Sequence, residues 1–425
     1  MTRRHLFLMR GFIVLASVAV ATTSARAQAA ASAPGTVAGG QPPGQQATTE
    51  PPPRDPVGDL NADVVTAGDF PGSFKIPGPG GVSLGIGGFV KALFFTDSNI
   101  EGRESVFLPA LIGGIGRDDE DGTTSLSAEL TRLSFDARVT TGEQKMRGYI
   151  EFDFSGDLFK WRHGYLTWSG SFGEVLAGKT WSTFMDLQTL PDGLGEPTVS
   201  GAIFTRQAMF RYSRQVSTLA RLQVAIEDSV SSDVQAVERV QTRAGYPDVV
   251  GNLTLGSAAR HLTVAAMVRS IDVDPDGIDV DAATGWGVNL GAHTMLGKRD
   301  RIYGAFAIGD GLGRYLVGVV PAAGAFVKPE TYEIRTRRNT GGFAGIRHAW
   351  NDTCRSSAVY SRAEAETDPR QPDNAFESSQ YVLGNLLCKA NRFLTVGVEY
   401  DYGTRGNKDG RTLDNHRVMV GMQLF

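Results

Sequence analysis

The sequence predicts an all-β protein, a transmembrane antiparallel β-barrel of about 16 strands behind a disordered N-terminal periplasmic segment. Three observations support this: an N-terminal export signal, apolar and polar residues that alternate in segment after segment, and links that alternate between short and long. A soluble β-sandwich would show the same alternation within strands. The link lengths favour the membrane barrel, because such barrels have tight periplasmic turns and long outer loops.

Residues 1–27 have the features of a secretory signal peptide. Arg3, Arg4 and Arg10 precede an apolar run from Gly11 to Ala21, and Ala25-Arg26-Ala27 gives a small-x-small cleavage pattern. The run is shorter than the roughly 20 apolar residues of a transmembrane helix. Removing this segment takes away four arginines and no carboxylate, which lowers the formal net charge from −4 to −8. An acidic mature chain gives no reason to expect nucleic acid as a partner.

Residues 28–68 are dominated by Ala, Pro, Gly, Gln and Thr. Such a composition cannot bury enough apolar surface to fold alone. We therefore expect a disordered periplasmic segment, followed by the barrel over residues 69–425.

Within 69–425, apolar residues recur at every second position. Leu262, Val264, Ala266 and Val268 alternate with residues that include Thr263 and Arg269, and Val396, Val398, Tyr400 and Tyr402 alternate with residues that include Glu399 and Asp401. In a membrane barrel the apolar side faces lipid and the polar side faces the lumen. The chain ends on a strand pattern and on Phe425, although Val418, Val420, Met422 and Leu424 are out of phase with that last residue.

The predicted links differ in length on the two sides of the barrel. Short links are expected at 296–299, 351–352 and 389–392, and long ones at 97–123, 229–248, 310–339 and 364–379. This alternation and an even strand number near the size that leaves an aqueous channel favour a pore.

Several motifs resemble those of the DcaP-like outer-membrane porins. They are DFPGSFKIPG at 69–78, RHGY at 162–165, AGKTWSTFMD at 177–186, VEY at 398–400 and DGR at 409–411. The resemblance implies a homotrimeric porin in the outer membrane of a Gram-negative bacterium, in contact with membrane lipid. It implies diffusion of small organic anions, including dicarboxylates. Relatives carry an N-terminal coiled-coil segment, whereas residues 28–68 show no heptads, so no part in trimerisation is predicted for them.

The segment 182–203, which follows the fifth predicted strand, is long and contains Asp186, Asp192 and Glu196. In general porins the loop at this place folds into the lumen, so we expect an inward-folded constriction loop. An ordinary surface loop is the alternative.

Charged wall residues are expected opposite such a loop, because fixed charge lowers the cost of stripping water from a counter-ion. Arginine suits carboxylate solutes, since its planar fork binds them in a bidentate way. The alternative for each arginine is a wall ion pair with an acid such as Asp136 or Glu151. The candidates for the constriction and for solute binding are Arg132, Arg138, Arg147, Arg206 and Arg211.

Cys354 and Cys388 are the two cysteines of the chain. A hairpin symmetric about Gln371 places them opposite each other, and an oxidising compartment permits a disulfide. Two free thiols are the alternative.

No enzyme, metal or cofactor motif stands out. Residues 81–85 match G-x-S-x-G without the strand-turn-helix context of a hydrolase, and no H-E-x-x-H occurs. We therefore expect no catalytic residues, no metal site and no cofactor. A barrel enzyme such as a phospholipase, or a structural surface protein, is the alternative function.

Overall fold

The computed structural model describes residues 67–76, 81–99, 106–113, 122–155, 159–229, 234–235, 241–243, 245–274, 280–319, 324–328 and 331–425. The predicted signal peptide and nearly all of the predicted segment 28–68 lie outside the described residues. Among the described residues, no helix is long and apolar enough to cross a lipid bilayer.

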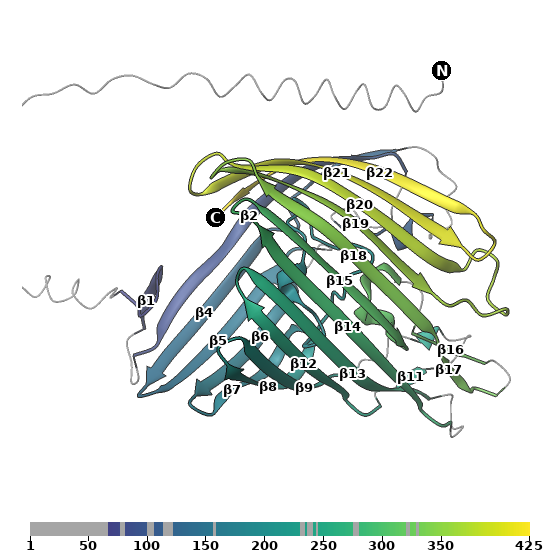
Figure 1. Ribbon diagram of the computed structural model, residues 1–425, viewed down its shortest axis with the longest axis horizontal. Helices are drawn as coiled ribbons and strands as arrows, with labels where there is room; N and C mark the ends of the chain where they lie inside the picture. Colours follow the sequence, from purple (N-terminus) through teal and green to yellow (C-terminus); the bar gives the residue numbers. More distant parts are fainter. Residues whose placement is uncertain are drawn as a thin grey trace, which may run out of the picture. The chain divides into compact units, whose positions relative to one another are not determined.

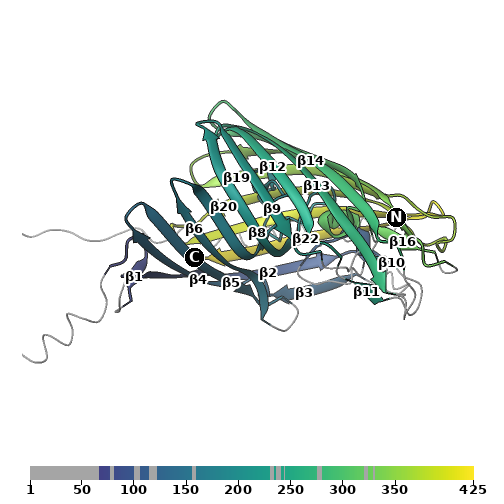
Figure 2. The same cartoon turned by 90° about the horizontal axis from the view of Figure 1, so that it is seen from below.

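The wall of the barrel is made of long antiparallel strands. They are β2 (Ser83–Asp97), β3 (Thr123–Ser127), β4 (Arg132–Thr141), β5 (Gln144–Asp153), β6 (Lys160–Gly170), β7 (Gly173–Trp181), β8 (Arg206–Ser217), β9 (Ala220–Glu227), β12 (Asp248–Ser257), β13 (Arg260–Asp274), β14 (Ala283–Leu296), β15 (Asp300–Asp310), β18 (Arg338–Ala349), β19 (Cys354–Ala365), β20 (Phe376–Lys389), β21 (Leu394–Asn407) and β22 (Thr412–Leu424). Figure 1 and Figure 2 show them side by side and strongly tilted.

The sheet closes through β2. One edge of β2 pairs with β22, from Val90↔Leu424 to Asp97↔Arg417. Its other edge pairs with β4 and then β3, which together act as one interrupted strand. Over the described residues this gives a closed antiparallel barrel of 16 strands, which confirms the predicted fold class.

The alternation seen in the sequence separates the two faces of the wall. In β13, Leu262, Val264 and Val268 are exposed on the outer surface, whereas Thr263 and Arg269, at alternate positions, are buried on the inner side. Successive side chains of a strand point to opposite faces, so one register fixes the whole strand. The outer face therefore presents the apolar surface that lipid requires.

Short and long connections alternate as expected. β14 and β15 are joined by residues 297–299, and β20 and β21 by 390–393. The opposite end of the barrel carries the long connections, including 311–337 between β15 and β18 with the short strands β16 (Ala325–Val327) and β17 (Ile334–Thr336). β16 also pairs with β10 (Val234–Gln235), and β11 (Gln241–Arg243) extends the wall beside β13.

Both ends of the described chain are fixed to the short-turn end. The short strand β1 (Ser73–Lys75) pairs with Ser83–Gly85 and covers part of the edge of β2 that β22 does not reach. Phe425 lies just beyond β22, and its ring packs edge-on against Phe89 with centroids 6.0 Å apart. Unpaired strand edges invite association with other strands, so this covering matters for solubility during assembly.

Three connections from the long-loop end enter the barrel and supply its core. They contain the 3-10 turns η1 (Pro109–Leu111), η2 (Leu187–Thr189), η3 (Gly313–Tyr315) and η4 (Val317–Val319). Two of them are joined backbone to backbone, since Phe204 N–H donates to Tyr315 O (2.9 Å) and Val317 N–H donates to Ala202 O (3.1 Å). Buried side chains such as Phe184 and Leu316 pack against inward-facing wall residues such as Met267. The lumen is thus narrowed by folded backbone.

Cys354 and Cys388 lie directly opposite each other on β19 and β20, and their sulfur atoms are bonded. The residue pairing matches the register expected from a hairpin centred near Gln371.

Candidate functional site

The chain turns inward immediately after β7. The Glu227 carboxylate of β9 accepts hydrogen bonds from Ser182 Oγ and from Thr183 N–H, both at 2.7 Å. The side-chain amides of Asn252 and Asn289 donate to the carbonyl oxygens of Thr183 (2.9 Å) and Phe184 (2.8 Å). Buried backbone groups need partners, and inward-facing polar residues of three wall strands supply them here.

Asp186 is held against the wall formed by β13 and β14. Its carboxylate lies 2.7 Å from His261 Nε2. It also accepts a hydrogen bond from the N–H of Gln188 (3.0 Å), so that Asp186 caps the start of the turn η2. Gly291 of β14 provides the space: a Cβ there would lie 2.3 Å from Asp186 Oδ2. Glycine at this inward position therefore permits the close approach of the loop.

The middle of the segment contacts the wall formed by β19, β20, β21 and β2. Asp192 forms an ion pair with Arg355 of β19, and Asn385 Nδ2 donates to Asp192 O (2.7 Å). The buried Glu399 of β21 accepts the N–H groups of Leu194 (2.6 Å) and Gly195 (3.1 Å). Lys91 of β2 donates from Nζ to Leu194 O (2.9 Å).

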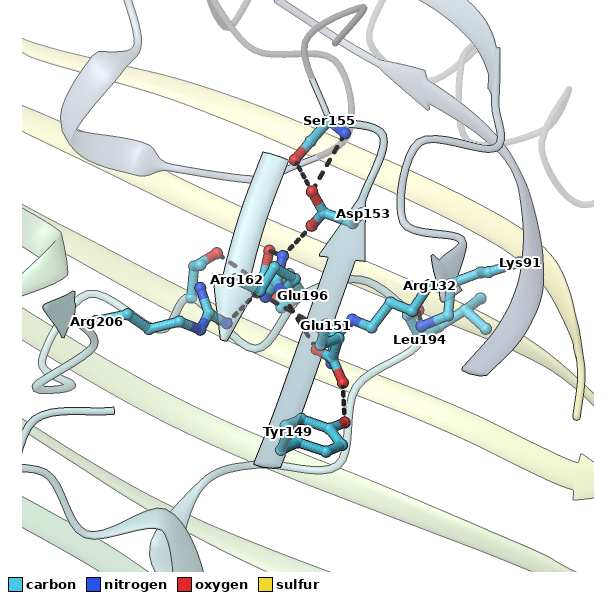
Figure 3. Close-up of polar contacts among 11 residues, drawn as sticks. Lys91, Arg132, Tyr149, Glu151, Asp153, Ser155, Arg162, Leu194, Glu196 and Arg206 are labelled. Atoms are coloured by element: carbon cyan, nitrogen blue, oxygen red, sulfur yellow. Dashed lines mark hydrogen bonds and ion pairs between the residues drawn. The ribbon is translucent and has the colours of Figure 1, made fainter. Parts of the chain in front are cut away.

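Glu196 then meets a group of arginines on β4, β6 and β8 (Figure 3). It pairs closely with Arg162, and its Oε1 lies 3.2 Å from Arg206 and 3.7 Å from Arg132. Arg162 also pairs with Asp153, and Arg132 lies 3.4 Å from Glu151. We call these six residues the Glu196 cluster; three guanidinium groups are matched by three carboxylates.

The charges of the Glu196 cluster set the ionisation of its central acid. Burial alone would raise the pKa of Glu196, but the guanidinium groups of Arg162, Arg206 and Arg132 lower it to about 2. Glu196 therefore stays charged over the whole physiological range, and its ion pairs hold the segment to the wall.

The structure brings together some of the predicted residues and separates others. Arg132 and Arg206 meet Glu196, and the Arg206 guanidinium also lies 3.4 Å from the centre of the Trp181 ring. Arg138 and Arg147 instead share Asp136, at 2.6 and 2.9 Å, near the short turn after β4. Asp186 and Asp192 lie against other strands, as described above.

Three lumen-facing arginines form no ion pair with a carboxylate among the described residues. Arg211 donates only to Trp181 O (3.4 Å). Arg301 donates to Gln188 O, and Arg347 lies opposite Arg301 in the neighbouring strand. All three are partly exposed. The acids that face the same lumen without a cation, such as Asp401, are buried and hydrogen-bonded, here by Tyr381 Oη (2.8 Å).

Sequence reasoning missed several of these residues as members of the site. Arg162 lies in a bulge between β5 and β6, where the pairing shifts from Glu151↔His163 to Phe152↔Trp161. Strict alternation cannot place such a residue. Arg301, Arg347 and Arg355 occupy inward positions of their strands, which the alternation in the sequence could have revealed.

No metal or cofactor was predicted. Among the residues that the structure describes, no group of three or more His, Cys, Asp or Glu side chains is arranged to hold a metal ion.

Comparisons with known proteins identify the fold. No protein-family model matches the sequence, and no curated protein is similar to it. The solved structure of the outer membrane channel DcaP of Acinetobacter baumannii is similar, with a TM-score of 0.72 and 20% identity over 82% of this chain and 99% of that one. An anion-selective porin from Comamonas acidovorans has a TM-score of 0.56 and 11% identity, over 81% of this chain and 99% of that one. Salmonella typhi OmpF in complex with daunomycin has a TM-score of 0.54 and 10% identity, over 82% of this chain and 100% of that one.

These structures are outer-membrane channels and porins, and they match the barrel over almost their whole length. The match agrees with the family resemblance in the sequence and with the predicted location in the outer membrane of a Gram-negative bacterium. The chain has the fold of the DcaP-like outer-membrane porins.

Proposed function

We propose that this protein is an outer-membrane porin that lets small hydrophilic solutes diffuse through its lumen and favours organic anions such as dicarboxylates. Export by a signal peptide at 1–27, contact with membrane lipid and assembly as a homotrimer are parts of this proposal. Among the residues that the structure describes, no specific arrangement favours the alternative functions considered above, a barrel enzyme or a structural surface protein.

The segment 182–203 acts as the constriction loop in this proposal. It is attached to wall strands on all sides of the lumen through Glu227, His261, Arg355, Glu399 and Arg162. A loop attached at so many places forms a fixed eyelet, and the wall beside it sets which solutes pass.

The anion preference rests on one observation: among the described residues, the lumen-facing arginines without an ion-pair partner are partly exposed, whereas acids without one, such as Glu227, Glu399 and Asp401, are buried. The three carboxylates of the segment, Asp186, Asp192 and Glu196, all have basic partners. Arg211, Arg301 and Arg347 have no carboxylate partner among the described residues. A fixed positive charge that is not neutralised lowers the electrostatic barrier for an anion and raises it for a cation.

Liposome swelling tests this function. Proteoliposomes that contain the purified protein should swell faster in succinate than in putrescine, a dication of similar length, and protein-free liposomes should take up neither. Equal impermeability to both solutes would argue against a porin. Faster entry of putrescine would argue against the anion preference.

A further inference from the structure

A second group of basic residues lies on the wall opposite the Glu196 cluster, towards the short-turn end of the barrel. Arg301 of β15 and Arg347 of β18 are direct cross-strand partners and both face the lumen. Like charges directly opposite each other destabilise a sheet. The Nε atoms of both side chains are buried and have no hydrogen-bond partner. No carboxylate of the described residues forms an ion pair with either guanidinium group, and Asp186 and Asp192 act on Arg301 only at longer range.

The two arginines line a cavity of about 310 Å³. Its other walls are formed by the turn η2 and by the neighbouring strands, through Leu187, Gln188, Leu190, Ala258, His293 and Met295. The volume is at the lower end of the range for small-molecule sites. One side of the cavity is cationic, and much of the rest is apolar.

The neighbouring basic residues do not compete for the same ligand. Arg355 on the next strand forms an ion pair with Asp192, and His261 contacts the carboxylate of Asp186. Within the described residues, Arg301 and Arg347 are thus the lumen-facing arginines of this wall that form no ion pair with a carboxylate.

We propose that this cavity is a binding site for the carboxylate of a small organic acid with an apolar body. The planar guanidinium groups of Arg301 and Arg347 match a carboxylate, and a bound anion would supply the charge that the pair lacks. Leu187, Leu190 and Met295 would receive the hydrocarbon part. A hydrated metal cation fits neither the charge nor this lining.

The inference rests on the proposed function, because a solute would reach the cavity through the lumen. It adds a site separate from the Glu196 cluster. That cluster lies on β4, β5, β6 and β8 and on the middle of the constriction segment, whereas this cavity lies between η2 and the wall formed by β14, β15 and β18. Because the cavity lies between the constriction segment and the wall near the short turns, the periplasmic end in such barrels, it is a site that an organic anion meets at the periplasmic side of the eyelet.

Titration of single-channel current with hexanoate in a planar bilayer tests the site. Arg347→Gln is the principal variant, because Arg347 holds no part of the loop, whereas Arg301 donates to Gln188 O. Losing one charge-assisted interaction should weaken hexanoate block by about tenfold or more. Hexanamide and acetate should block the wild-type channel less well, because one lacks the charge and the other lacks the apolar chain.

Arg260→Gln is the matched control. Arg260 begins β13 at the same end of the barrel and is exposed on the outer surface. This variant loses the same charge and should bind hexanoate like the wild type. Equal block of wild type and Arg347→Gln, or equal block by hexanoate and hexanamide, would overturn the site while the channel still conducts. A protein that forms no channel would instead contradict the proposed function.

Discussion

Glu196 offers the sharpest test of how the constriction is held. The change Glu196→Gln keeps the shape of the side chain and removes its charge. Arg162 would keep Asp153, but Arg206 would lose the carboxylate that it contacts. The ion pair between Glu196 and Arg162 is almost completely buried, with 8% of the Glu196 side chain and 1% of the Arg162 side chain exposed. Hydrogen bonds to charged groups contribute about 1.5–3 kcal/mol, and we expect a loss of about that size in the free energy of unfolding.

The same change should alter ion selectivity. A unit charge about 4 Å from an ion in water is worth about 1 kcal/mol. Removing the negative charge should therefore lower the barrier for an anion and raise that for a cation by about 1 kcal/mol each, which raises the ratio of anion to cation permeability by about thirtyfold. Zero-current potentials in a KCl gradient measure this ratio, and urea titration of the folded form measures stability.

Two further variants serve as controls for Glu196→Gln. Glu196→Asp keeps the charge and should preserve selectivity. Glu364→Gln removes a charge that is half exposed and paired with Arg362 on the outer wall, where ion pairs are worth about 0–1 kcal/mol. If Glu196→Gln behaves like Glu364→Gln in both measurements, the reasoning about the Glu196 cluster is refuted.

Three further predictions concern pH, the disulfide and the fit of the loop. Because the ion pairs lower the pKa of Glu196 from its ordinary value of 4.5 to about 2, its stabilising charge is fully present above about pH 4.5 and is lost as the pH falls through 2. Because Glu196 stays charged between pH 7 and pH 5, it should cause little change in the ion selectivity of the wild type over this range. A large change in selectivity that is absent in Glu196→Gln would contradict this. Intact-mass analysis after alkylation without reductant should show no alkyl groups on Cys354 and Cys388, whereas two added groups would mean free thiols. Gly291→Val should push Asp186 away and change single-channel conductance, but Gly251→Val, with no atom within 4 Å of its Cβ, should leave it unaltered; equal effects would argue against the close fit of the loop.

Much of the fold could be predicted because barrel strands repeat one local rule. Residues such as Leu262 and Val264 mark the lipid face without any knowledge of their neighbours, since the side-chain period is two. The pairing of Cys354 with Cys388 followed from the symmetry of one hairpin.

The site was less predictable, because its contacts join distant strands. The partner of Asp186 is His261, 75 positions away, and depends on the path of the loop across the lumen. The β-bulge at Arg162 changes which side of the wall this side chain points to. No signal in the sequence is strong enough to locate the bulge. Alternation can place Arg301 and Arg347 on the inner face, but whether a carboxylate neutralises them depends on the folded loop.

We propose that the protein is an open channel that prefers anions. Single-channel recording of the purified protein in a planar bilayer with a tenfold KCl gradient tests both properties at once. We predict discrete conductance steps and a zero-current potential displaced towards the equilibrium potential of chloride. A bilayer that shows no steps would contradict the channel, and a potential displaced towards that of potassium would contradict the assignment of Arg211, Arg301 and Arg347 as the charges that decide selectivity.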